Sequence, residues 1–218
     1  MKTPSEPVRD PPVVLFDFDG TLADSFPALL RVAAQLAGEE NRTLPDAGEI
    51  RALRKLHTLE LLRRSGIPLA RVPFWLKRVR RRLALETPGM QSFSGMEEAL
   101  AGLRKRGARL GIITSNGEEA VRLFLRNHRW EPWFDLVETG SPLFGKARLI
   151  RRAARRLGAG DPGRMWYAGD ELRDIEAARE AGVRSAAVTW GFNDPEVLAA
   201  AGPDAVLRHP AELLSLAD

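Results

Sequence analysis

Two aspartates end an apolar run near the start of the chain, in the stretch VVLFDFDGTLADS from Val13 to Ser25. Asp17 and Asp19 are unsuited to the interior of a strand, because Asp is a poor strand former and a buried charge needs a partner. A turn would account for Asp19 followed by Gly20, but it leaves Asp17 unexplained. We therefore predict that the two carboxylates carry out chemistry at the end of a strand.

Other polar groups follow later apolar runs or begin later helices. They are Thr114, Ser115, Asn116, Lys146, Asp170 and Asp174. Ligands of open α/β sheets bind beyond the carboxyl ends of the strands, so converging strand ends would gather up to four carboxylates, hydroxyl donors and one ammonium. Helix capping is an alternative for Thr114 to Asn116. Lys146 could be a solvated lysine, but the first turn of a helix disfavours a cation that has no anion nearby.

Clustered carboxylates need a compensating charge, and a hard cation with oxygen ligands supplies it. We expect Mg²⁺, with Mn²⁺ open as an alternative. The three histidines, His57, His128 and His209, are too scattered for a zinc-type cluster, and the chain has no cysteine. One Asp could then form an aspartyl-phosphate, and a second Asp could act as general acid and base.

Short apolar runs alternate with helical patterns outside residues 26–91. The expected strands are Val13–Asp17, Arg109–Thr114, Leu136–Glu138, Met165–Ala168 and Ala186–Thr189. The expected helices are Met96–Arg106, Glu118–Asn127, Lys146–Leu157, Arg173–Ala181, Pro195–Ala201 and Ala211–Leu216. This alternation predicts an α/β fold, a Rossmann-like parallel sheet with helices on both faces.

Residues 26–91 contain no strand-like run and read as three amphipathic helices, Phe26–Leu36, Gly48–Arg64 and Pro73–Leu85. We expect them to form a small α-helical cap inserted after the first strand. The predicted organisation is a disordered lead-in over 1–10, an α/β catalytic core over 11–25 and 92–218, and the cap over 26–91.

Composition indicates a globular protein that works away from membranes. Of 218 residues, 44% are hydrophobic and 28% are charged, which is enough to bury a core. No run reaches the length of a membrane span, and the first ten residues lack the apolar stretch of a signal peptide. We expect a cytoplasmic location and no membrane partner.

The net charge of +4 is distributed unevenly, since residues 26–91 carry 13 Lys and Arg against 6 Asp and Glu. The run from Lys77 to Arg82 contributes most of this surplus. A solvated helix face is the ordinary explanation; a second is that part of the run overhangs the acidic site and steers an anionic substrate. Nucleic acid has thin support, because no aromatic residues accompany the run on a strand.

The motifs resemble those of the haloacid dehalogenase superfamily. Asp17-Phe18-Asp19-Gly20-Thr21 resembles its first motif, GIITSN its second and GDELRD its fourth, while Lys146 stands where the third motif has a lysine. The helical insert resembles the subgroup that includes phosphoglycolate phosphatases and β-phosphoglucomutases. One departure is Ala147, where the family often has Pro after the lysine.

The resemblance implies a Mg²⁺-dependent phosphatase with a role for each motif residue. Asp17 would be nucleophile and metal ligand, and Asp19 would be general acid and base and lend its carbonyl oxygen to the metal. Asp170 would complete the metal ligands, and Asp174 would support the metal or Lys146. Thr114, Ser115, Asn116 and Lys146 would bind the phosphoryl group of the substrate.

The expected substrate is a small anionic phosphorylated metabolite, with phosphoglycolate as the first candidate on resemblance alone. A sugar phosphate mutase would use the same phospho-enzyme, and a regulatory protein could keep the fold without turnover. A dehalogenase is disfavoured, because that chemistry needs neither the second Asp nor a metal. The sequence leaves open whether the protein is a monomer or a homodimer.

Overall fold

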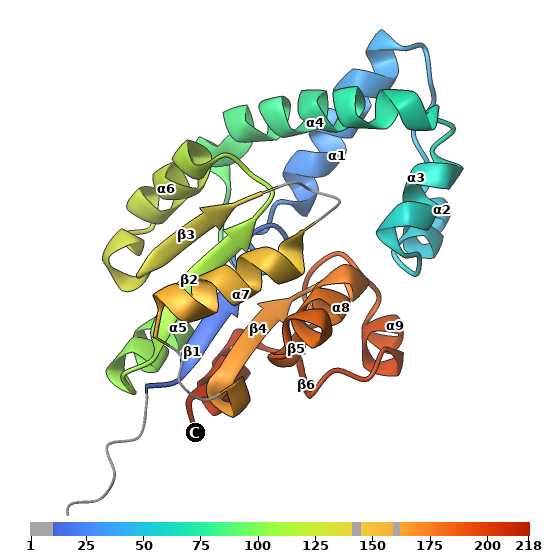
Figure 1. Cartoon of the computed structure of the whole chain (residues 1–218). Coiled ribbons are helices and arrows are strands. Elements are labelled where there is room, and N and C mark those ends of the chain that lie inside the picture. Colours follow the sequence, from blue (N-terminus) through green and yellow to red (C-terminus); the bar gives the residue numbers. More distant parts are fainter. Residues whose placement is uncertain (1–10, 141–144, 159–161) are drawn as a thin grey trace, which may run out of the picture.

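A computed structural model describes residues 11–140, 145–158 and 162–218 of the protein. Six parallel strands form one sheet in the order β3-β2-β1-β4-β5-β6 (Figure 1). Their bounds are β1 Val13–Phe16, β2 Arg109–Thr114, β3 Leu136–Thr139, β4 Met165–Gly169, β5 Arg184–Val188 and β6 Ala205–Leu207. The lead-in predicted for residues 1–10 lies outside the described residues.

Helices cover both faces of the sheet, because alternate residues of each central strand point to opposite sides. Val14 and Phe16 of β1 pack in one core with α5 (Met96–Lys105) and α6 (Glu118–Asn127). Val13 and Leu15 pack in a second core with α7 (Lys146–Arg156) and α8 (Leu172–Ala181). The predicted Rossmann-like α/β fold is confirmed.

The C-terminal part departs from the sequence prediction in two places. β6 was not predicted, since its apolar run is only three residues long and is defined by pairing with β5. After it, Pro210–Ala217 forms a 3₁₀ helix, where a short helix over Ala211–Leu216 was expected. Between β5 and β6 lies α9 (Pro195–Ala200), as predicted to within one residue.

Four α-helices separate β1 from α5 and lie beyond the carboxyl ends of the strands (Figure 1). They are α1 Phe26–Glu39, α2 Ala47–Leu53, α3 Thr58–Arg64 and α4 Val72–Glu86. The single helix predicted over Gly48–Arg64 is wrong. The chain leaves the helix after Leu53, and His57 caps the next one by accepting the Leu59 N–H at 3.3 Å.

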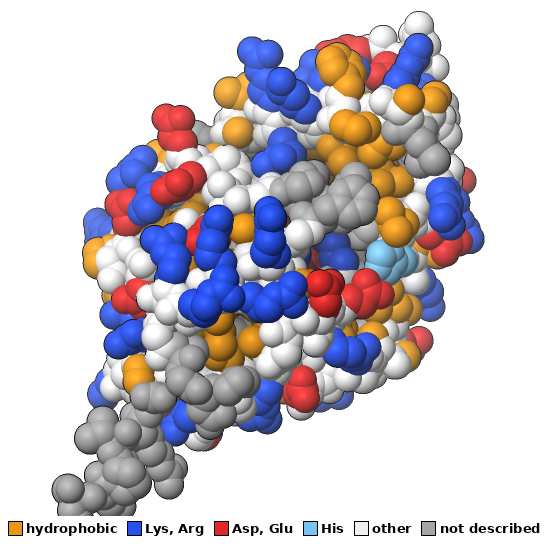
Figure 2. Space-filling model, viewed as in Figure 1, with side chains coloured by type: hydrophobic (Ala, Val, Ile, Leu, Met, Phe, Trp, Pro, Cys, Tyr) orange, Lys and Arg blue, Asp and Glu red, His pale blue; other side chains and the backbone are white. Residues whose placement is uncertain are grey.

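Long helices α1 and α4 pack through an apolar seam and an ion-pair network. Arg78 of α4 contacts Glu39, the last residue of α1, and Glu40, which follows it, both at 2.8 Å, and Arg82 contacts Glu39 at 2.6 Å. Two of the five cations in the basic run, Arg78 and Arg82, therefore pair with acidic residues at the end of the neighbouring helix. A second concentration of Lys and Arg lies over α7 (Figure 2), where Arg152 and Arg156 pair with the buried Glu138.

Within the described ranges, no helix is long and apolar enough to cross a membrane.

Candidate active site

The site begins where the strand order reverses, between β1 and β4. Chain segments leave these neighbouring strands in opposite directions, and α/β folds bind ligands at the carboxyl ends of the strands at such a reversal. We call this place in the fold the crevice. Phe16 pairs with Ala168, and the Asp17 N–H donates to the Ala168 carbonyl at 2.8 Å. Asp17 after β1 and Asp170 after β4 are thus brought together by the register of the sheet.

Three carboxylates meet in this crevice. One oxygen each of Asp17, Asp170 and Asp174 lies within 4.8 Å of the others, and the exposed fractions of the three residues are 4%, 0% and 1%. Buried carboxylates this close repel one another unless a cation compensates them. The donor set, carboxylate oxygen only, fits a hard divalent cation.

Asp170 is held by both of its oxygens. Thr21 Oγ1 donates to Oδ1 and the Phe192 N–H donates to Oδ2, each at 2.8 Å. Glycines make room on either side: a Cβ on Gly20 would lie 2.2 Å from Oδ2, and one on Gly191 would lie 2.3 Å from the Asp170 Cβ. Burial, followed by the negative charge of Glu171, raises the pKa of Asp170 well above its usual range.

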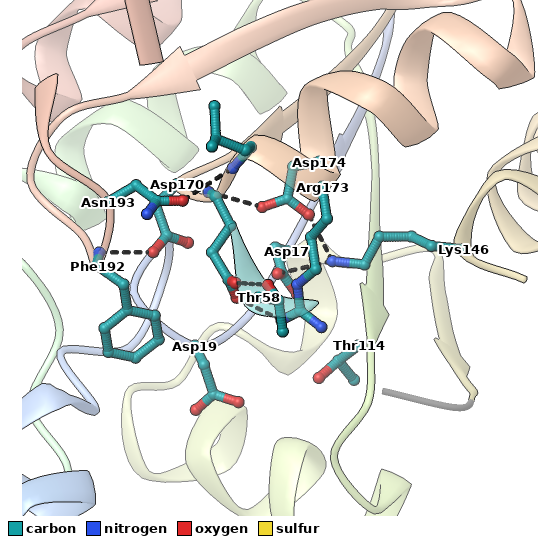
Figure 3. A network of polar contacts seen from close by, with 12 residues as sticks. Asp17, Asp19, Thr58, Thr114, Lys146, Asp170, Arg173, Asp174, Phe192 and Asn193 are labelled. Atoms are coloured by element: carbon teal, nitrogen blue, oxygen red, sulfur yellow. Dashed lines mark hydrogen bonds and ion pairs between the residues drawn. The ribbon is translucent and has the colours of Figure 1, made fainter. Parts of the chain in front are cut away.

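Lys146 joins the cluster from the opposite wall. Gly145, with φ of 85°, starts α7, and the Lys146 ammonium reaches Asp17 Oδ2 at 2.8 Å and Asp174 Oδ1 at 2.5 Å (Figure 3). Burial lowers the pKa of Lys146, but the charges of Asp17 and Asp174 outweigh it and the pKa is raised. The ammonium is therefore a permanent cation. It offsets part of the acidic charge.

Asp174 ties this cluster to the start of α8, where its Oδ2 accepts the Glu171 N–H at 3.0 Å. Burial raises the pKa of Asp174 to about 6, against the lowering effect of Lys146. A Cβ on Gly169 would lie 2.4 Å from this carboxyl group, so the end of β4 must be glycine for Asp174 to turn inward.

Asp19 lies in the same crevice, apart from the three clustered carboxylates. Its Oδ2 accepts the Asn116 side-chain N–H at 2.7 Å, while among the described residues its buried Oδ1 has no hydrogen-bond partner. Burial and then the charge of Asp17 raise the pKa of Asp19 to about 6. Asp19 is therefore suited to gain and release a proton near neutral pH.

Thr114 ends β2 and is buried, and its hydroxyl accepts the Asn116 N–H at 3.0 Å. Figure 3 shows Thr114 facing the crevice beside Asp19 and Lys146. Ser115 follows it and is half-buried. The structure thus brings the β2 end to the carboxylates, although the Asn116 side chain is engaged with Asp19.

Two arginines add charges that the sequence prediction did not assign to the site individually. Arg173, beside Asp174 on α8, is ion-paired with Glu171, and its pKa is raised because the charges of Glu171, Asp174 and Asp17 outweigh burial. Partial burial lowers the pKa of Arg80 on α4, and the charge of Asp19 opposes that shift. Arg80, a member of the basic run, thus interacts electrostatically with Asp19.

The model of one protein family, haloacid dehalogenase-like hydrolase, matches residues 14–188. The chain belongs to this family. Among curated relatives, a phosphoglycolate phosphatase of Synechococcus elongatus is 38% identical over 201 residues, which are 92% of this chain and 94% of the relative. An N-acetylmuramic acid 6-phosphate phosphatase of Pseudomonas putida is 28% identical, covering 94% of this chain and 95% of the relative.

Solved structures agree with the fold. A haloacid dehalogenase-like hydrolase from Streptococcus pneumoniae has a TM-score of 0.79 at 24% identity, with 94% of this chain and 97% of that chain covered. Another haloacid dehalogenase-like hydrolase, from Bacteroides fragilis, has a TM-score of 0.77 at 27% identity, with 94% and 100% covered. The predicted membership of the haloacid dehalogenase superfamily is confirmed. The predicted enzyme class, phosphoric monoester hydrolase, is confirmed as well.

Sequence reasoning missed three contributors to this haloacid dehalogenase-like site. Thr21 was noted only as part of the first motif, whereas its hydroxyl holds Asp170. Arg173 was noted only as part of the fourth motif, whereas its guanidinium is ion-paired with Glu171 beside the carboxylates. Asn193 accepts the Leu172 N–H at 2.9 Å and donates its own backbone N–H to the Asp170 carbonyl at 3.2 Å. Only the turn-forming Asn-Asp-Pro stretch hinted at Asn193.

Proposed function

We propose that this chain is a Mg²⁺-dependent phosphatase that hydrolyses phosphoglycolate through an aspartyl-phosphate on Asp17. One observation carries the proposal. Asp17 is buried between Lys146 and two further carboxylates, and the unpartnered oxygen of Asp19 lies in the same crevice. The relative that is 38% identical, named a phosphoglycolate phosphatase, supports the choice of substrate.

The residues that would hold Mg²⁺ are Asp17, Asp170 and the backbone carbonyl of Asp19, with Asp174 supporting them. When bound, the cation would neutralise the negative charge that keeps an anionic phosphate away from a carboxylate nucleophile. Mn²⁺ has the same preference for oxygen ligands and stays an alternative.

The Asp17 carboxylate would attack phosphorus, and the bond from phosphorus to the leaving oxygen would break. Lys146 would donate to one phosphoryl oxygen, and Thr114, Ser115 and the N–H groups that follow β2 would donate to the others. In this role the Asn116 side chain keeps its contact with Asp19 and serves the phosphate only through its backbone.

Asp19 would donate a proton to the leaving alkoxide and then take one from the water that hydrolyses the aspartyl-phosphate. A pKa of about 6 suits both steps, since the carboxyl group is neither fully protonated nor strongly acidic near neutral pH. The Asn116 amide orients one oxygen and leaves the other for the proton transfer.

Phosphoglycolate carries a carboxylate close to its phosphate, and two guanidinium groups near the site could bind that carboxylate. Arg173 lies among Asp17, Asp174 and Lys146 in Figure 3, and Arg80 brings a positive charge from α4. N-acetylmuramic acid 6-phosphate, the compound named in the relative that is 28% identical, is the second candidate substrate. It also carries a carboxylate, but on a bulky sugar.

The test is phosphate release from phosphoglycolate, N-acetylmuramic acid 6-phosphate and glucose 1-phosphate, with MgCl₂, MnCl₂ or EDTA. We expect the highest kcat/KM for phosphoglycolate, no turnover in EDTA and none by Asp17→Asn. Preference for the amino sugar would select the second candidate. Conversion of a sugar phosphate without phosphate release would identify a mutase, and no activity on any phosphate ester would favour a regulatory protein.

In this proposal residues 26–91 form a cap that closes over the crevice and excludes bulk water, while 11–25 and 92–218 form the catalytic core. A cytoplasmic location and a monomeric or dimeric state remain predictions. Residues 26–91 also supply Arg80, so the cap takes part in selecting the leaving group.

A further inference from the structure

The connection between α2 and α3 is fastened to the segment that follows β5. The Arg54 guanidinium donates from Nε to the Phe192 carbonyl and from Nη2 to the Gly191 carbonyl, both at 2.7 Å. In return, the Arg54 carbonyl accepts the Asp194 N–H at 3.0 Å and the Asn193 side-chain N–H at 2.7 Å. We call these reciprocal contacts the Arg54 clasp.

The clasp is packed as well as hydrogen-bonded. The rings of Phe26 and Phe192 have centroids 5.7 Å apart, and the Arg54 guanidinium lies 5.9 Å from the Phe26 ring centroid. The Asn193 side-chain N–H also reaches the Leu56 carbonyl at 3.2 Å. Because Asn193 contacts two carbonyls of the short connection between α2 and α3, it holds that connection in a single orientation. An isolated ion pair at the surface would not fix the orientation in this way.

The same three residues, 191–193, form one wall around Asp170. The Phe192 N–H donates to Asp170 Oδ2 at 2.8 Å, and the Asn193 N–H donates to the Asp170 carbonyl at 3.2 Å. Gly191 approaches so closely that a Cβ on it would lie 2.3 Å from Asp170 Oδ2. A shift of this segment must therefore move the Asp170 carboxylate.

We propose that Arg54 is a positioning residue, which sets the Asp170 carboxylate for the metal by holding the Gly191–Asn193 segment. This inference rests on the metal role of Asp170 in the proposed function. Arg54 accepts or donates no hydrogen bond with any of the clustered carboxylates, so its influence on the metal passes through backbone carbonyls. By linkage, a bound metal strengthens the clasp as much as the clasp strengthens metal binding.

The experiment is a calorimetric titration of the full chain with MgCl₂, with no substrate present. Arg54→Met keeps the aliphatic stem and removes the donors to Gly191 and Phe192. We expect the Kd for Mg²⁺ to rise about tenfold, as for other residues that orient metal ligands. Arg54→Lys keeps the charge and one donor and should restore part of the affinity. The matched control is Arg51→Met, which replaces an exposed arginine in the last turn of α2; this variant should bind Mg²⁺ as the wild type does.

Hydrogen exchange of the Asp194 N–H supplies a second readout that does not depend on activity. Added Mg²⁺ should slow this exchange in the wild type and have little effect in Arg54→Met. Equal Mg²⁺ affinity in Arg54→Met and wild type, or exchange that ignores Mg²⁺, would overturn the positioning role alone. A wild type that binds no Mg²⁺ would overturn the metal site of the proposed function as well.

Discussion

Replacing Asp19 by Asn should make the metal-free protein more stable while it destroys turnover. The carboxyl group is buried, lies near the charge of Asp17, and leaves Oδ1 without a partner among the described residues. Asn keeps an oxygen that can accept the Asn116 N–H and carries no charge. The ionised Asp19 carboxylate therefore lowers the stability of the folded protein, but its role in proton transfer requires it.

The size of the effect follows from the pKa. The rise of the Asp19 pKa from 3.8 to about 6 corresponds to about 3 kcal/mol of destabilisation at a pH where Asp19 is ionised in both the folded and the unfolded protein. Because the folded protein binds the proton more tightly, the wild type gains stability as the pH falls through about 6. The advantage of Asp19→Asn should therefore be about 3 kcal/mol at pH 7.5 and below about 1 kcal/mol at pH 4.

The assay is urea unfolding in EDTA at both pH values, with Asp24→Asn as the control. Asp24 follows the turn and is not one of the clustered carboxylates, so its replacement should change stability by less than about 0.5 kcal/mol. The expected gain also appears as a Tm higher by roughly 6 to 12 °C at pH 7.5. A variant no more stable than the wild type, or a gain in stability that does not depend on pH, would show that the ionised Asp19 does not destabilise the folded protein. Turnover should fall by about 10² to 10⁴.

Three further changes test other parts of the site. Lys146→Met should lower kcat/KM by at least about 10², because an ammonium that contacts both Asp17 and the phosphate is lost; steady-state kinetics with unchanged values would remove Lys146 from the site. Asp170→Ala should weaken Mg²⁺ binding by at least about tenfold in calorimetry, and an unchanged titration curve would exclude it as a ligand. Arg80→Ser should raise KM for phosphoglycolate several-fold at low salt, whereas Arg81→Ser, which replaces an exposed arginine, should not. Equal KM values for the two variants would contradict a contact between Arg80 and the substrate.

The residues at the strand ends were predictable because the sheet itself positions them. Asp17 and Asp170 follow strands that pair residue by residue, so an apolar run ending in Asp was enough to place both carboxylates at one edge. The order of the motifs along the chain, with Lys146 opening a helix, added the cation. These relations depend on local pattern and on the geometry of parallel strands.

Contacts between distant loops were not predictable in the same way. The break in the expected Gly48–Arg64 helix has no Gly or Pro to mark it; the carbonyls of Arg54 and Leu56 instead bond to Asn193. β6 is equally hidden, since three residues become a strand only through pairing with β5. Such features are set by tertiary contacts that override local propensity.

The proposed mechanism requires Asp17 to become phosphorylated, and trapping that species is the decisive experiment. Borohydride added during turnover of phosphoglycolate with Mg²⁺ would reduce an aspartyl-phosphate to homoserine, which peptide mass spectrometry can locate. We expect homoserine at residue 17 only when substrate and Mg²⁺ are both present. Steady turnover with Asp17 unmodified, or homoserine at another aspartate, would contradict the mechanism.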